Sequence, residues 1–306
     1  MMKRVVAIVG PTGVGKSALA LRLARDFDGE IISADSRQVY RYLDIGTAKT
    51  TRAEQASVPH HLIDIVDPDQ DFSLAHYQEL AYKAIDNVSS RGHLPVLAGG
   101  SGLYIWAVLE GWQIPRVAPD TALRKRLEGR AAAGEAATLY EELKQLDVEA
   151  ADRIDPRNVR RVIRALEITQ NPGANSKTVK IKPPFEELII GLTAPRDELY
   201  RRIDERIDEM VSHGLVKEVE SLVSRGYRLE LPSMSGIGYR QIGDYLQGKV
   251  SLEGAIQQVK NESHRLVRMQ YNWFSPKDDR IKWFDINTNP YSQIKAPLSE
   301  FLKEQV

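Results

Sequence analysis

The segment GPTGVGKS, residues 10–17, has the spacing of a phosphate-binding loop, with an apolar run before it. Its glycines let backbone N–H groups turn toward phosphate oxygens, and a following helix N-terminus adds partial positive charge. Lys16 offers a point charge for the terminal phosphate, and the hydroxyl of Ser17 is a candidate Mg²⁺ ligand. The spacing indicates a phosphate ligand without indicating which one. The predicted phosphate-binding residues are Gly10, Pro11, Thr12, Gly13, Val14, Gly15, Lys16 and Ser17.

A carboxylate follows the next apolar segment, in the sequence IISADS. Asp35 is followed there by Ser36, Arg37 and Gln38. An Asp at the end of a strand commonly caps a turn. Beside a phosphate loop it could instead accept a proton from an incoming nucleophile. We favour the second role, and the polar residues after Asp35 carry enough hydrogen-bonding groups to read the edge of a base.

A third apolar segment, LPVLAGG, ends without the acidic pair by which a motor-type NTPase holds Mg²⁺ and orients water. It runs instead into GGSGLY, whose N–H groups and Ser101 hydroxyl could donate to a diphosphate oxygen. A tight turn before a helix would explain the same residues. The missing acid argues against an RNA-binding ATPase.

Hydrophobic periodicity predicts the elements that must position these segments. Apolar, β-branched runs at 5–9, 30–36, 94–100 and 184–195 predict strands, and residues 16–27 have apolar positions at helical spacing. Strand–loop–helix–strand repeats predict an α/β fold, a P-loop NTPase-like parallel sheet core with helices on both faces. Because ligands bind at the carboxyl ends of such strands, the three loops should converge on one crevice.

The residue composition of the chain changes after the proline-containing linker WQIPRVAPD. Residues 120–170 look wholly helical, and a short loop, NPGANSK, follows them. We predict a P-loop α/β catalytic core of residues 1–115 and 185–306 and a helical insertion domain of residues 116–184. Within the core, residues 196–225 predict one charged amphipathic helix.

The segment RNVRRVIRALEI predicts a helix with one basic face. Arg157, Arg160, Arg161 and Arg164 fall at i, i+3, i+4 and i+7, opposite an apolar face. Glu167 is the one acid within this window. We therefore predict four unneutralised guanidiniums that meet a phosphate backbone, rather than a solvated face with its own ion pairs.

Composition limits the partners. Lys plus Arg and Asp plus Glu number 42 each in 306 residues, so net charge gives no argument for nucleic acid. The lack of cysteine excludes disulfides and fits a reducing cytoplasm. Adjacent His60 and His61 point apart, so they are poor metal co-ligands and have structural roles. No apolar run approaches the ~20 residues that span a bilayer. We expect a cytoplasmic monomer that does not engage membranes.

As a set, several segments resemble the tRNA dimethylallyltransferases, also called tRNA isopentenyltransferases, over nearly the whole chain and in the family's order. The resemblance implies transfer of the dimethylallyl group of dimethylallyl diphosphate to the exocyclic amine of the adenine 3′-adjacent to a tRNA anticodon. Diphosphate is released, and Mg²⁺ is the cofactor. The segments are GPTGVGKS, ISADSRQVY, DIGTAK, PHHLIDI, GGSGLY, RRVIRALEI and GIGYRQI.

The resemblance also implies roles for single residues. Thr12 to Ser17 would hold the diphosphate, Asp35 would be the catalytic base, and residues 35–38 would contact a flipped-out adenine. Ser101 stands where the family has a threonine that contacts both sites, so it joins Asp35 as a catalytic residue. The helical insertion would be a mobile domain that grips the anticodon stem-loop. The implied tRNA-binding residues are Asp35, Ser36, Arg37, Gln38, Ser101, Arg124, Arg160, Arg161 and Arg164.

Two other enzymes remain as alternatives. A small-molecule or nucleotide kinase would use Asp35 to activate an acceptor hydroxyl. An isopentenyltransferase acting on free adenine nucleotide would use the same loop and base. Both leave the helical insertion and its arginines without a role.

Overall fold

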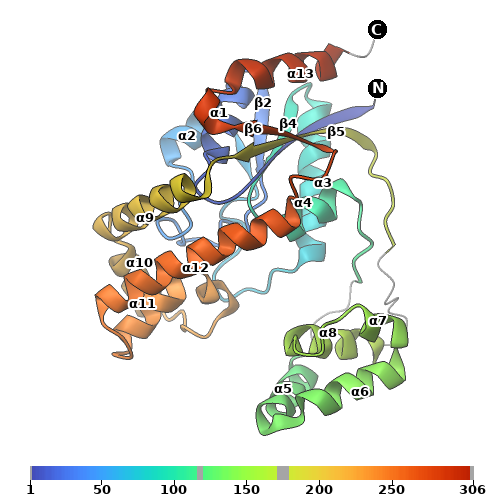
Figure 1. Cartoon of the computed structure of the whole chain (residues 1–306), viewed down its shortest axis with the longest axis vertical. Helices are drawn as coiled ribbons and strands as arrows, with labels where there is room; N and C mark the ends of the chain where they lie inside the picture. The colour runs from blue at the N-terminus through green and yellow to red at the C-terminus, as the bar shows by residue number, and fades with distance from the viewer. Residues whose placement is uncertain (1, 116–119, 171–178, 304–306) are drawn as a thin grey trace. The chain divides into compact units, whose positions relative to one another are not determined.

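The computed structural model describes residues 2–115, 120–170 and 179–303. The chain divides into two compact units, and Figure 1 draws the ribbon of each. The core unit comprises Met1–Leu109 and Pro183–Val306, and the helical unit comprises Glu110–Lys182.

A six-stranded sheet forms the centre of the core unit among the described residues, in the order β3-β2-β4-β1-β5-β6. Every neighbouring pair of strands is parallel. Helices flank this sheet, which confirms the predicted α/β fold. Two strands were not predicted, because β3 has only two residues and β6 lies at an edge with only Ile281 buried. The strands are β1 (Lys3–Val9), β2 (Gly29–Ser33), β3 (His60–His61), β4 (Leu94–Ala98), β5 (Phe185–Thr193) and β6 (Ile281–Asp285).

The helices of the core unit follow the strands as crossovers or pack together beyond them. The single helix predicted over residues 196–225 is wrong. Gly214 adopts φ +105°, a left-handed conformation that ends one helix and begins the next. The helices are α1 (Lys16–Asp26), α2 (Arg52–Ser57), α3 (Leu74–Ser90), α4 (Gly102–Leu109), α9 (Arg196–Ser212), α10 (Leu215–Ser224), α11 (Tyr239–Leu246), α12 (Leu252–Trp273) and α13 (Tyr291–Lys303), with 3₁₀ turns η2 (Pro232–Ser235) and η3 (Ile286–Thr288).

Apolar residues of the sheet and of α1 and α9 form the core beneath the loops. Val5 to Val9 of β1 are fully buried, as expected for a central parallel strand with both faces covered. Leu199, Ile203 and Ile207 form the buried stripe of α9 in the same cluster. This stripe brings one side of α9 against the phosphate loop, where Ile203 lies close to Gly13.

The helical unit has its own apolar core, built from Leu127, Leu139, Leu143 and Leu166. Its two ends pair with each other, since Gln113 N–H donates to the Val179 carbonyl and Ile181 N–H donates to the Gly111 carbonyl. Residues 110–115 and 179–182 both fall in the helical unit. The loop NPGANSK lies outside the described residues. The elements are α5 (Thr121–Arg130), the π-helical turn η1 (Ala131–Glu135), α6 (Ala136–Leu146), α7 (Val148–Asp152) and α8 (Val159–Thr169).

The adjacent residues His60 and His61 make structural contacts with neighbouring parts of the protein. His61 Nε2 lies 2.7 Å from Oε2 of buried Glu30. Arg91 binds the same carboxylate with two hydrogen bonds and lowers the pKa of Glu30 to about 2. His60 Nδ1 contacts the Val58 carbonyl. Within the described ranges, no cluster of three His, Cys, Asp or Glu side chains is arranged for a metal ion.

No helix in the part of the chain that the structure describes has both the length and the apolar character needed to cross a bilayer.

Candidate active site

A cleft of about 770 Å³ opens in the core unit beyond the carboxyl ends of β1, β2 and β4. The structure thus brings together the three loops that the sequence marks as chemically interesting. Gly10, Pro11 and Val14 are not part of the lining; Gly10 packs against β5, where an added Cβ would lie 2.4 Å from the Leu192 carbonyl oxygen. The predicted residues that line the cleft are Thr12, Gly13, Gly15, Lys16, Ser17, Asp35, Ser36, Arg37, Gln38 and Ser101.

The phosphate loop presents its lysine to this cleft. Gly15 adopts φ +91° as the N-cap of α1, a conformation that glycine tolerates. The ammonium of Lys16 donates to the Pro11 carbonyl at 2.7 Å. Burial, together with the positive charge of Arg206, lowers the pKa of Lys16 to about 7, while the negative charge of Asp35 acts in the opposite direction. An anion bound in the cleft would favour the charged form of Lys16 and so raise its pKa.

Arg206 of α9 is a cleft residue that the sequence analysis did not predict. It lines the cleft, and burial lowers its pKa, while the negative charge of Asp35 acts in the opposite direction. Arg202, one helical turn earlier, also lines the cleft but donates to Glu198 at 2.7 Å. The available signal was the position of Arg206 beside the apolar stripe at Ile203 and Ile207, which faces the protein rather than solvent.

Asp35 caps the turn that follows β2. Its Oδ1 accepts the Arg37 N–H at 2.8 Å and the Gln38 N–H at 3.4 Å. Within the described residues, Oδ2 accepts no hydrogen bond. The two roles considered for Asp35 are therefore compatible, because one oxygen holds the turn and the other stays available to a proton.

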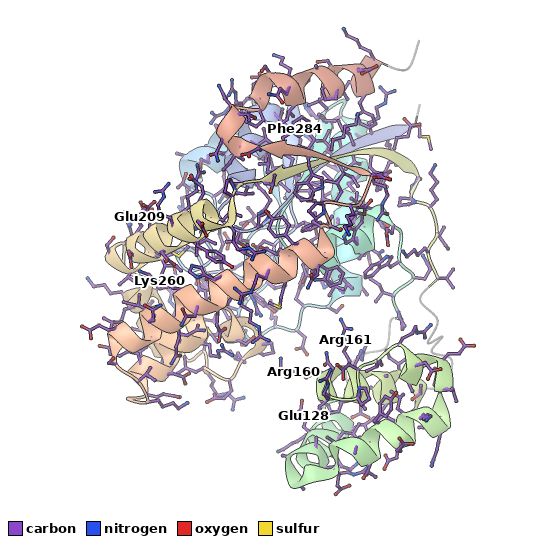
Figure 2. The ribbon with its side chains drawn as sticks, viewed as in Figure 1. Glu128, Arg160, Arg161, Glu209, Lys260 and Phe284 are labelled. Atoms are coloured by element: carbon purple, nitrogen blue, oxygen red, sulfur yellow. The ribbon has the colours of Figure 1, made fainter. Side chains whose placement is uncertain are left out.

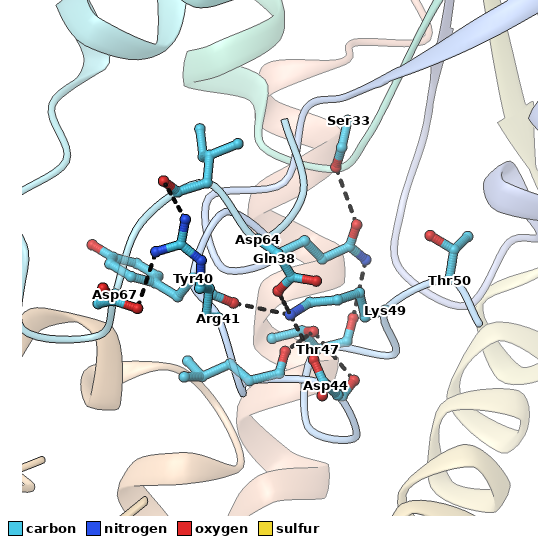
Figure 3. A network of polar contacts seen from close by, with 12 residues as sticks. Ser33, Gln38, Tyr40, Arg41, Asp44, Thr47, Lys49, Thr50, Asp64 and Asp67 are labelled. Atoms are coloured by element: carbon cyan, nitrogen blue, oxygen red, sulfur yellow. Dashed lines mark hydrogen bonds and ion pairs between the residues drawn. The ribbon is translucent and has the colours of Figure 1, made fainter. Parts of the chain in front are cut away.

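Arg37 and Gln38 are both engaged by the protein. The guanidinium of Arg37 donates to the carbonyls of Pro232 and Ser233, at 2.6 and 3.3 Å, and so holds the η2 turn. Gln38 accepts from the Ser33 hydroxyl at 3.1 Å and donates to the Thr47 carbonyl at 3.3 Å (Figure 3).

The loop after residue 43 is fixed by a buried lysine. Lys49, with a side chain 4% exposed, binds Asp44 and Asp64 at 2.6 Å each and donates to the Tyr40 carbonyl (Figure 3). Glu218 of α10 accepts the N–H groups of residues 44–46. This loop carries the carbonyls that accept hydrogen bonds from Gln38. Fixing the loop therefore also fixes a side chain that lines the cleft.

Ser101 is bonded to the turn that carries Asp35. Its hydroxyl accepts the Ser36 N–H at 3.1 Å, and its own N–H donates to the Ala34 carbonyl at 3.2 Å. The two backbones approach so closely that a Cβ on Gly99 would lie 2.1 Å from the Ala34 oxygen. The turn after β4 and the turn after β2 are therefore one packed structure.

The arginines of the helical unit differ from the prediction of four unneutralised groups. Arg157 precedes α8 and pairs with Asp155 at 2.8 Å. Glu167 turns inward with a fully buried carboxylate that binds Arg164 at 3.1 Å and Arg124 at 2.7 Å. The prediction of unneutralised charge is wrong for Arg157 and Arg164. Asp155, just before the helix, neutralises Arg157, and the single acid of the window, Glu167, neutralises Arg164.

Arg160 and Arg161 remain exposed at the beginning of α8, and Figure 2 labels both. Neither has an ion-pair partner within the described residues. These two guanidiniums keep their full hydrogen-bonding capacity for a ligand of the helical unit.

Comparison with known proteins identifies the family to which this chain belongs. The family model described as IPP transferase matches residues 38–277. The chain belongs to this family. It is 49% identical over 307 residues to the tRNA dimethylallyltransferase of Thermomicrobium roseum, covering 99% of this chain and 93% of the relative. It is 47% identical over 301 residues to the enzyme of the same name from Dehalococcoides mccartyi, covering 98% and 93%.

Solved structures of related transferases support the same family assignment. The tRNA isopentenylpyrophosphate transferase of Bacillus halodurans superposes with TM-score 0.74 at 42% identity, covering 99% of this chain and 97% of that one. A eukaryotic dimethylallyltransferase acting on tRNA gives TM-score 0.80 at 26% identity, covering 99% and 80%.

The lowered pKa of Lys16 predicts that pyrophosphate binding depends on pH. An anion favours the charged ammonium, so binding above pH about 7 must take up a proton, and affinity should fall as pH rises from about 6 to about 8.5. Calorimetry in buffers of different ionisation enthalpy counts the proton. Lys16→Met is the control, since it retains only the titration of pyrophosphate itself. Identical pH dependence in both proteins would contradict the prediction.

Proposed function

We propose that this member of the IPP transferase family moves a dimethylallyl group from dimethylallyl diphosphate to the exocyclic amine of the adenine 3′-adjacent to the anticodon in tRNA. The observation that carries the proposal is one cleft in which Lys16 and Arg206 lie near Asp35, the one acidic side chain among its described lining residues. Relatives named for the same activity support it.

The arrangement fits displacement of diphosphate by an amine. As the allylic carbon–oxygen bond breaks, negative charge grows on the bridging oxygen, where Lys16, Arg206 and the loop N–H groups stabilise it. The amine nitrogen forms the new bond to that carbon, and Asp35 accepts the amine proton. Diphosphate then leaves with the electrons of the broken bond. The phosphate loop holds the leaving group and transfers no phosphoryl group.

The residues present fit a Mg²⁺ ion that is held mainly by the substrate. Ser17 is exposed in the first turn of α1 and lines the cleft, so its hydroxyl is the expected protein ligand. The described residues hold no cluster of three acidic or histidine ligands, so diphosphate oxygens and water would complete the coordination. A bound Mg²⁺ would neutralise diphosphate charge.

The acceptor adenine must leave its stack to reach this cleft, at a cost of a few kcal/mol. Asp35, Ser36, Arg37, Gln38 and Ser101 would surround the extruded base, with Ser101 fixing the turn that carries Asp35. Apolar side chains of α9 in the same lining would cover the dimethylallyl group; they are Ile203, Ile207 and Met210.

The helical unit would grip the anticodon stem-loop through its arginines. Arg160 and Arg161 are exposed donors that suit phosphate oxygens. The shared carboxylate of Glu167 holds Arg124 and Arg164 in fixed orientations, which would lower the entropy lost when they meet RNA.

The direct test incubates the protein with labelled dimethylallyl diphosphate and an unmodified tRNA transcript, with AMP as a competing acceptor. The proposal requires label in the tRNA and release of pyrophosphate. Label that enters AMP alone would identify a free-nucleotide enzyme, and phosphoryl transfer from ATP without prenyl transfer would identify a kinase.

Asp35→Asn should separate the role of Asp35 as a base from its role in capping the turn after β2. Asparagine keeps an oxygen that can accept the Arg37 N–H but cannot take a proton, so kcat should fall by at least about 100-fold. Pyrophosphate affinity, measured by calorimetry, should be unchanged or higher, because the variant loses a negative charge near the anion. Asp35→Ala removes the turn cap as well and serves as the comparison. Loss of pyrophosphate binding in the Asn variant would show that Asp35 has another role.

Replacement of both Arg160 and Arg161 by Ala should weaken tRNA binding and reduce the slope of log affinity against log salt by about 1.5. Filter binding across a salt series measures both quantities. Arg130→Ala is the matched control, because Glu135 and Glu142 already bind that guanidinium at 2.8 and 2.6 Å. An unchanged slope in the double variant would remove these arginines from the interface.

A further inference from the structure

Gln270 of α12 connects two loops of the cleft that no local sequence pattern joins. Its side chain is buried, with the residue 4% exposed, and it lines the cleft. Oε1 accepts the Thr12 N–H at 2.8 Å, and Nε2 donates to the Gly100 carbonyl at 3.0 Å. One amide thus satisfies a donor of the phosphate loop and an acceptor of the turn after β4.

The path continues from Gly100 to the proposed base. Ser101 accepts the Ser36 N–H, and the neighbouring Asp35 carboxylate accepts the Arg37 N–H. A path of hydrogen bonds, with the covalent link from Gly100 to Ser101 between them, therefore runs from Thr12 through Gln270 to the turn that carries Asp35. The phosphate loop and that turn otherwise lie on different strands, β1 and β2, which are separated in the sheet by β4.

Any other residue type at Gly100 would have to displace the Gln270 amide. A Cβ there would lie 2.5 Å from Nε2 of Gln270 and 3.6 Å from Nζ of Lys16. Gln270 and Lys16 therefore occupy adjoining space above this glycine. The end of α12 is also fixed, because the Trp106 indole donates to the Trp273 carbonyl at 2.8 Å.

We propose that Gln270 is a positioning residue that holds the phosphate loop and the Ser101 turn at a fixed separation. The inference rests on the proposed function, in which the leaving diphosphate and the amine that Asp35 deprotonates must both be aligned on one allylic carbon. A small error in this alignment slows the chemical step far more than it weakens binding, because most loop N–H groups still reach the diphosphate. Loss of the Gln270 amide should therefore lower kcat and leave diphosphate affinity almost intact.

The test replaces Gln270 with Met, which keeps the length and approximate volume of the side chain and removes both hydrogen bonds. Gln78→Met is the matched control, since Gln78 donates to the Ala107 carbonyl at 2.6 Å in the same unit but does not line the cleft. In the Gln270 variant, kcat for tRNA prenylation should fall about 10- to 100-fold. Its pyrophosphate Kd should change by less than about threefold, and its melting temperature should match that of the control. Equal kcat in the two variants, or a loss of pyrophosphate binding that accounts for the whole defect, would overturn the proposal.

A second measurement needs no variant and no prenyl transfer. The Thr12 amide should be protected from hydrogen exchange in the ligand-free wild-type protein, because the Gln270 oxygen holds it. A freely exchanging Thr12 amide overturns the proposal even if Gln270→Met does not fold. If the wild-type protein transfers no prenyl group while this amide is protected, the proposed function fails and the contact stands.

Discussion

The arrangement depends on two cations, Lys16 and Arg206, that share a cleft with a single carboxylate, Asp35, among its described lining residues. Withdrawing like charges from water is unfavourable, and burial lowers the pKa of both groups. Such a site gains most when an anion of more than one charge enters it. A departing diphosphate, whose charge rises as its bond to carbon breaks, gains more than a neutral ligand or a monoanion.

The loops around these cations are held by partners that are distant in the sequence. Glu218 binds the N–H groups of residues 44–46, Arg37 holds the η2 turn, and Gln270 joins Thr12 to Gly100. Each contact gives a backbone N–H or carbonyl group of these loops a hydrogen-bond partner. The cleft is therefore organised before a ligand arrives, which lowers the reorganisation required in the transition state.

The sequence predicted what depends on local spacing. The phosphate loop between β1 and α1 follows from glycine positions and one apolar run, and the convergence of three loops follows from the rules of parallel sheets. Arg206 and Gln270 were not predicted, because their roles depend on contacts that join distant elements. The arginine face of α8 was predicted with too many free charges. Helical spacing showed that Arg164 and Glu167 are near each other but not that the carboxylate would be buried with Arg124 as well.

The role of the paired cations is tested most directly by comparing pyrophosphate binding by Arg206→Met and Arg202→Met. Both residues line the cleft from the same face of α9, but Arg202 is already bound to Glu198. We expect Arg206→Met to weaken pyrophosphate binding at least about tenfold, because it removes a charge-assisted contact, and Arg202→Met to have a much smaller effect. Equal affinities for pyrophosphate in the two variants would contradict a cleft whose paired cations stabilise the leaving group.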